Sequence, residues 1–324
     1  MTWLSSFIMR RPLNAVLVAS VFAVLSIVIP PLSLFSGATL ALVSLRLGLG
    51  VGVKVLVGAG ITVAIFAALI DASRVSSPVG EVFSLMAMAM LPLLLLLSWV
   101  LRETRSLSIT VVASGVLAMV IVVFMYVVVG DTTVWWRAVF EEVYVLAQAN
   151  GQPITSTELD ALVAVVAKAS HGAAGLIAFL GLTGSLLLAR WWQSNLYNPG
   201  GYRAEFHNLR LDRRIGFVVL LVLGLMIVSS GLWAQLAADL LIVLLAMYML
   251  VGIALVHSVV AFKNAPRAIL VALYLLLLFP PTTSQVAILL ASAGFADSWL
   301  DLRRRLGISP VSQRKMNDES EDDQ

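Results

Sequence analysis

The first group of residues able to do chemistry is Lys168, Ser170 and His171, which lies within a long apolar stretch. An amine, a hydroxyl and an imidazole within one helical turn can together bind a small anionic or polar ligand. Ionisable side chains inside a bilayer are costly, about 2.5–3.5 kcal/mol at the centre of a helix, so each of them suggests a function. The alternative is that Lys168 extends its amine to the outer membrane–water interface and holds no ligand.

The second group lies in residues 190–214, the longest polar interruption of the chain, with five arginines and two acids. The sequence Asn-Pro-Gly-Gly, which begins at Asn198, predicts a tight turn. Beyond it, Arg203, His207 and Arg210 recur at helical spacing beside an apolar strip, which predicts a short helix lying on an anionic membrane surface. These four residues are candidates for binding an anionic lipid or a protein partner, because guanidinium groups bind phosphate and carboxylate. The alternative is an ordinary cytoplasmic loop, which is commonly basic.

The remaining polar residues suggest less chemistry. His257, near one end of its helix, is either a neutral histidine bonded to a backbone carbonyl or part of a proton relay. Gln235 and Asp239 are expected to flank a tight outer turn and to be solvated. With three histidines, no cysteine and no catalytic or phosphate-loop motif, the sequence predicts no specific enzyme, no metal site and no cofactor. Membrane lipids are the expected surroundings, and nucleic acid is not an expected partner.

Composition assigns the chain to a class of protein. Hydrophobic residues make up 60% and charged residues 12%, with a mean hydropathy of +0.98. Ordinary globular domains are about 45–50% apolar and about 25% charged. The apolar runs are continuous and do not alternate every second residue, which favours helices over a membrane barrel. We therefore predict an all-α fold, a polytopic transmembrane helical bundle.

The bundle is expected to contain eight to ten membrane segments. The apolar stretches that predict them are 13–29, 32–45, 55–70, 82–101, 107–129, 155–189, 215–233, 240–262, 268–279 and 286–295. Two Pro-Pro pairs, at Pro30 and Pro280, divide short hairpins near both ends of the chain. Each hairpin can be two crossings or one re-entrant loop, which leaves both ten and eight segments open.

The connections between apolar stretches carry further signals. Residues 134–150 predict an amphipathic surface helix within an extracytoplasmic insert, 131–160. Thr155 or Ser156 can cap the next helix, which runs for about 34 residues, or about 50 Å. That length exceeds the ~30 Å hydrocarbon core. One face of this helix carries small residues suited to close helix packing; they are Gly172, Gly175, Ala178, Gly181 and Ser185.

Basic residues predict the orientation of the chain. If every apolar stretch crosses, all 21 Lys and Arg residues except Arg74, Arg137 and Lys168 lie on one side. Such a bias marks the cytoplasmic side. We therefore predict a single membrane domain, residues 1–300, in a bacterial inner membrane with both termini in the cytoplasm. The polar residues 301–324 are expected to form a disordered cytoplasmic tail.

Two segments resemble a known family. Residues Ala189–Leu211, and more weakly the pattern Arg46-x-Gly48-x-x-x-Gly52, resemble the YybS-like family of predicted bacterial membrane proteins. This resemblance covers roughly residues 10–300. It implies distant similarity to the substrate-binding membrane subunits of energy-coupling-factor vitamin transporters and to the cell-shape protein MreD. The family has no established catalytic or ligand residues, so the resemblance assigns no residue a role.

Three functions fit these observations. The first is a small-molecule binding or transport subunit, which the transporter-like resemblance favours. The second is a non-transporting membrane scaffold or assembly protein that recruits partners through the basic loop 190–214. The third is a membrane enzyme that holds a lipid-linked phosphate with the arginine cluster.

Overall fold

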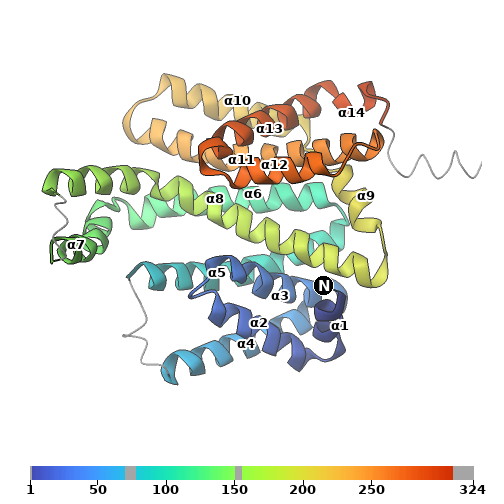
Figure 1. Ribbon diagram of the computed structural model, residues 1–324, viewed down its shortest axis with the longest axis horizontal. Coiled ribbons are helices and arrows are strands. Elements are labelled where there is room, and N and C mark those ends of the chain that lie inside the picture. Colours follow the sequence, from blue (N-terminus) through green and yellow to red (C-terminus); the bar gives the residue numbers. More distant parts are fainter. Residues whose placement is uncertain (1, 70–77, 150–154, 309–324) are drawn as a thin grey trace, which may run out of the picture.

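The computed structural model describes residues 2–69, 78–149 and 155–308, and it confirms the all-α prediction. Over these ranges the chain forms helices and their connections and no strand. Figure 1 shows the helices running side by side in three groups. The N-terminal helices form one group, the C-terminal helices form another, and the long helix α8 lies between them together with α6.

Helix α8, Ser156–Tyr197, organises the bundle. Its 42 residues correspond to about 63 Å. The predicted cap is Thr155, whose hydroxyl accepts from the amide of Glu158 at 3.2 Å. The Glu158 carboxylate accepts from the Thr155 amide in return, which completes a capping box. The helix packs against α3 in the N-terminal group, α11 in the C-terminal group and α6 beside it.

The N-terminal group packs around the C-terminal half of α8. Its elements are α1 (Thr2–Arg10), α2 (Pro12–Leu25), η1 (Pro30–Leu32), α3 (Ser33–Leu47), α4 (Leu49–Leu69) and α5 (Pro78–Thr104). The first Pro-Pro pair forms η1 and separates α2 from α3. Gly48, with φ of +96°, makes the turn between α3 and α4. The core of this group includes Trp192 of α8, which is completely buried.

The C-terminal group packs on the other side of α8 and α6. Its elements are α10 (Arg213–Val228), α11 (Gly231–Phe262), α12 (Ala268–Leu278), α13 (Pro280–Leu300) and α14 (Leu302–Arg305). Helices α12 and α13 meet at a bend of 117° at the second Pro-Pro pair, since proline cannot continue a helical hydrogen-bond ladder. The predicted hairpin is therefore present, and α13 folds back against α11.

The two ends of the bundle differ in what they carry. Helix α6 (Leu107–Phe124) continues into η3, a π-helical turn at Met125–Val129, and then into α7 (Thr133–Ala149) at one end. Figure 1 shows the short helix α9 (Gly201–His207) at the opposite end, together with α14 and the N-terminus. The loop 190–214 and the insert that contains α7 thus lie at opposite ends, as the predicted topology requires.

Several helices are long and apolar enough to cross a membrane. Within the described ranges five helical stretches meet this condition, and the bent pair α12–α13 makes up to six. The five are Pro30–Leu47, Leu49–Phe66, Leu107–Val129, Ser156–Tyr197 and Gly231–Phe262. Helices α2, α5 and α10 add further apolar helices to the bundle, and the total of eight to ten crossings stays a prediction.

Two boundaries differ from the sequence-based expectation. Helix α11 begins at Gly231, so Gln235 and Asp239 lie within a helix and not in a solvated turn; Asp239 is buried. The tail was expected from residue 301, but α14 follows at once and its Arg303 is also buried. Both corrections concern charged residues that find partners far away along the chain, which a local reading of the sequence does not show.

The small-residue face of α8 is only partly a packing face. A Cβ atom built at Gly175 would lie 2.3 Å from Val122 Cγ2 and 3.0 Å from Val243 Cγ2, so α6 and α11 approach closely there. A Cβ atom built at Gly181 would have no neighbour within 4 Å. The prediction of close packing therefore applies to Gly175 and is wrong for Gly181.

This difference supplies a test within one helix. We expect Gly175→Leu to lower the melting temperature of the detergent-extracted protein strongly, because the added side chain must displace Val122 and Val243. Gly181→Leu makes the same substitution in the same helix, but its side chain would face open space. This variant should therefore melt close to wild type. Equal melting temperatures for the two variants would show that α6 and α11 do not approach α8 as described.

Candidate functional site

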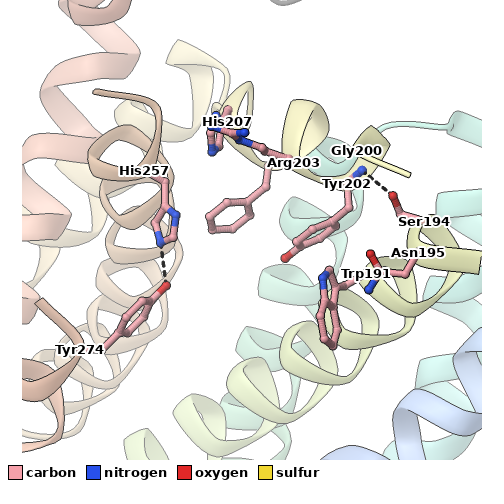
Figure 2. Close-up of a pocket in the computed structure, with 10 residues that line it drawn as sticks. Trp191, Ser194, Asn195, Gly200, Tyr202, Arg203, His207, His257 and Tyr274 are labelled. Carbon is pink, nitrogen blue, oxygen red and sulfur yellow. Dashed lines mark hydrogen bonds between the residues drawn. The ribbon is translucent and has the colours of Figure 1, made fainter. Parts of the chain in front are cut away.

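A pocket of about 290 Å³ opens at the end of the bundle that carries α9. Figure 2 shows Trp191 and Tyr202 on one side of it, with His257 and Tyr274 on the other. Helices α8, α9, α11 and α12 all contribute to the walls. The lining residues are Trp191, Ser194, Asn195, Gly200, Tyr202, Arg203, Phe206, His207, His257 and Tyr274. The pocket is therefore lined by aromatic side chains together with a few polar groups.

The predicted tight turn places α9 over this pocket. Gly200 has φ of +89°, a left-handed conformation that favours glycine. The Gly201 amide donates to the Asn198 carbonyl at 3.0 Å, and Ser194 Oγ donates to the same carbonyl at 2.7 Å. Ser194 Oγ also accepts from the Tyr202 amide at 2.9 Å. Ser194, a residue that the sequence did not single out, thus holds both sides of the turn.

An ion pair and an apolar strip fasten α9 to the bundle. Arg190 Nε donates to Glu205 Oε2 at 2.8 Å, and a second guanidinium nitrogen contacts the other oxygen, so the pair is bidentate. Phe206, Leu209 and Leu211 are buried in the core formed by α6, α8, α11 and α13. The apolar strip therefore packs on protein, which corrects the prediction of a helix with its apolar face in the membrane surface.

The two histidines of the pocket are in different settings. His257 Nε2 lies 2.8 Å from Tyr274 Oη, so its partner is a side chain and not the expected backbone carbonyl. Burial, followed by the positive charges of Arg203, His257 and Arg303, lowers the pKa of His207 to about 4. His207 is consequently neutral at neutral pH. Burial likewise raises the pKa of the Tyr202 phenol, which stays protonated.

Arg203 is the exposed cation of this pocket. Its side chain forms no hydrogen bond or ion pair with any residue in the described part of the chain, whereas Arg190 and Arg210 are both paired. Arg203 is close enough to His207 to lower the pKa of that imidazole. The guanidinium is thus available to a ligand at the mouth of the pocket.

Arg210 does not join Arg203 and His207, contrary to the helical spacing. Helix α9 ends at His207, and the chain then leaves the helical path. The Arg210 amide is 3.3 Å from Ser108 Oγ, and its guanidinium pairs with Asp301 at 2.6 Å. Arg210 therefore fastens the loop to α6 and to the chain beside α14. Asn198, another predicted candidate, shapes the turn and is exposed outside the pocket lining.

Arg303, which the sequence did not indicate, links the loop to the C-terminal helices. Its Nη1 donates to the His207 carbonyl at 2.6 Å, and its Nη2 donates to the Leu209 carbonyl at 2.9 Å. Its Nε lies 3.2 Å from Asp297 Oδ2. Burial lowers the pKa of Arg303 to about 10, so the guanidinium remains charged at neutral pH. The Arg303 guanidinium thus holds the loop backbone through two hydrogen bonds, and the buried carboxylate of Asp297 balances its charge.

The predicted group Lys168, Ser170 and His171 lies at the opposite end, beside α7. Ser170 Oγ accepts from Trp136 Nε1 at 2.5 Å and donates to the Val166 carbonyl at 2.8 Å, so its hydroxyl holds α7 against α8. The side chain of Lys168 is exposed, whereas that of His171 is buried. The three side chains differ in exposure and in partners, and neither of the two pockets described is lined by them; the ligand pocket expected there stays a prediction.

Over residues 2–69, 78–149 and 155–308, no group of three or more His, Cys, Asp or Glu side chains is arranged to hold a metal ion. No family model, curated protein or solved structure matches this chain. Its function therefore has to be inferred from the chemistry and positions of its own residues.

Proposed function

We propose that this protein is a bacterial inner-membrane protein that binds a small ligand through an anionic group, phosphate or carboxylate, as a binding or transport subunit. The binding site is the pocket between α8, α9, α11 and α12. The observation that carries the proposal is Arg203, an exposed guanidinium without a protein partner among the described residues, at a pocket that also presents His207, His257 and Tyr274.

These groups have complementary roles toward an anion. A guanidinium presents two parallel N–H donors to phosphate or carboxylate. The Tyr274 hydroxyl and the imidazoles can add neutral hydrogen bonds, and Trp191 and Tyr202 supply aromatic surface for the rest of the ligand. Burial is the main cause of the low pKa of His207, and nearby positive charges lower it further; a bound anion would offset those charges. Anion binding is therefore expected to favour proton uptake by His207.

The proposed location and orientation rest on the distribution of charge. Arg46, which lies over the Tyr197 ring at 4.2 Å, joins Arg190, Arg210 and Arg303 at the end of the bundle that carries α9. This is the expected arrangement for a cytoplasmic side. The resemblance of Ala189–Leu211 to the YybS-like family supports the same proposal, since that family is distantly similar to substrate-binding transporter subunits.

The test compares Arg203 with a matched arginine outside the pocket. Inorganic phosphate should raise the melting temperature of the wild-type protein in phosphatidylcholine nanodiscs. The apparent Kd should be about tenfold weaker in Arg203→Lys, because lysine keeps the charge but loses the two-pronged geometry, and weaker still in Arg203→Ala. Arg214→Ala removes an exposed charge at the same end and should leave the Kd unchanged.

A second arm distinguishes the sources of the anion. If the ligand is a lipid headgroup, stabilisation that depends on Arg203 should appear in phosphatidylglycerol nanodiscs without added phosphate. If it is a free anion, stabilisation should require phosphate in either lipid. Failure to find any stabilisation that depends on Arg203 in both arms would contradict the proposed function.

The scaffold alternative is favoured by a different observation. Arg213 and Arg214 are exposed at the start of α10 and lie outside the pocket, where a partner protein could reach them. A scaffold would depend on that surface. In a complemented deletion strain, loss of function with Arg214→Ala but not with Arg203→Ala would therefore support the scaffold and contradict ligand binding in the pocket.

A further inference from the structure

A second polar cluster lies at the end of the bundle opposite the pocket, where three helical elements meet. Asp239 of α11 is 2% exposed. Tyr126 Oη of η3 donates to Asp239 Oδ2 at 2.7 Å, and Gln235 Nε2 donates to Asp239 Oδ1 at 3.3 Å. Tyr126 lies in the π-helical turn, a distortion that is frequent at functional sites. The carboxyl thus has a donor for each oxygen although it is closed off from water.

His171 of α8 completes the cluster. Its ring stacks on Tyr126 with centroids 4.3 Å apart, and it is 7% exposed. Its Nε2 atom is buried without a hydrogen-bond partner. Gly172 brings α8 so close to α11 that a Cβ atom there would lie 2.6 Å from Asp239 Oδ1. A buried nitrogen without a hydrogen-bond partner is destabilising, so a histidine that interacts electrostatically with a buried acid here calls for an explanation.

The charges that face Asp239 come from the elements packed around it. Lys168 and His171 of α8 both interact electrostatically with Asp239, and Asp131, which follows η3, interacts with His171. Helix α6 contains no ionisable residue, and the arginines of α10 lie at its opposite end. Farther out, Arg137 and Asp160 pair with each other. Lys168 and Asp131 are thus exposed, whereas Asp239 and His171 are buried.

We propose that Asp239 is a proton-binding site of this membrane bundle, with Tyr126 and His171 as the residues that stabilise its two charge states. With one proton in the cluster, either Asp239 is a neutral carboxylic acid beside a neutral imidazole, or the carboxylate faces an imidazolium. Both states are neutral overall. Each therefore avoids an uncompensated charge inside the bundle, which a fixed carboxylate without His171 would leave.

The consequence is a link between protonation and helix packing. Tyr126, His171 and Asp239 belong to η3, α8 and α11, and Gln235 also donates to the Lys168 carbonyl at 3.2 Å. A change in the charge of Asp239 alters the strength of the hydrogen bonds that Tyr126 and Gln235 donate to it, because hydrogen bonds to ionised groups are stronger than neutral ones. The cluster does not depend on the pocket at the other end, so either proposal can fail without the other.

The test is pH-dependent infrared difference spectroscopy of the full chain in nanodiscs. The wild-type protein should show a band of a protonated carboxyl that titrates with pH and that is absent from Asp239→Asn. Removing the Tyr126 hydroxyl in Tyr126→Phe, or the imidazole in His171→Gln, should move this titration to higher pH by about one to two units, since each stabilises the carboxylate. Asp160→Asn removes an exposed carboxyl and should leave the band in place.

Tyr126→Phe keeps the test decisive even if Asp239→Asn does not fold, because it removes a single hydroxyl. An unchanged titration in both Tyr126→Phe and His171→Gln would overturn the proposal. So would a wild-type carboxyl band that persists at full amplitude in folded Asp239→Asn.

Discussion

Gly252→Ala is expected to abolish most of the folded protein, although it adds only one methyl group. A Cβ atom at Gly252 would lie 2.0 Å from the Leu290 carbonyl oxygen and 2.6 Å from its carbonyl carbon. These are backbone atoms of α13, which cannot rotate away as a side chain can. Helices α11 and α13 would have to separate along their whole contact, the most extensive between any two elements described.

Each of the two helices, α11 and α13, contributes a glycine to this close contact. A Cβ atom at Gly294 of α13 would lie 2.2 Å from the Tyr248 carbonyl oxygen of α11. Glycine at both positions therefore lets the two backbones touch, a packing mode common between membrane helices. Overpacking of a core costs about 1–3 kcal/mol when side chains can adjust, and the cost here should lie at or above the top of that range.

The measurement is the yield of monodisperse protein after extraction, together with its melting temperature. Gly224→Ala is the matched control, because it adds the same methyl group to α10, where a Cβ atom has no neighbour within 4 Å. The control should behave like wild type. If Gly252→Ala and Gly224→Ala were extracted and melted alike, the direct backbone contact of α11 with α13 would be refuted.

Arg303→Met is expected to produce the second large loss of stability. Arg303 is 2% exposed, and the side chain of Asp297, its partner, is fully buried. Removing one member of a buried ion pair leaves the other uncompensated, which costs about 3–5 kcal/mol. Arg210 lies 3.8 Å from Asp297 Oδ2 and compensates only in part. The carbonyls of His207 and Leu209 also lose their donors, so the loop should loosen.

Two further variants identify the cause. Asp297→Asn combined with Arg303→Met should recover part of the lost melting temperature, because the orphaned charge has been removed. Arg304→Met, at an exposed position next in the chain, should have little effect. A double variant no more stable than Arg303→Met alone would show that the buried charge is not the source of the loss.

The sequence by itself determined the features that depend on composition and on neighbours along the chain. Continuous apolar runs require helices in a membrane, because every backbone polar group must be satisfied within its segment. The helix cap, expected at Thr155 or Ser156, is Thr155, and the turn that begins at Asn198 formed as expected, since each depends on a few adjacent residues. The bend at Pro280 follows from the chemistry of proline alone.

Only the tertiary structure gave different environments to residues that look equivalent in the sequence. Gly175 and Gly181 lie on the same predicted face, yet only Gly175 touches a neighbouring helix. Arg203 and Arg210 share a predicted spacing, yet one is unpaired at a pocket and the other is held by Asp301. Asp239 and Arg303 read as solvated charges but are buried through partners more than 90 residues away, Tyr126 and the Leu209 carbonyl respectively. Such contacts depend on the rotation and approach of whole helices, which local propensity and spacing do not specify.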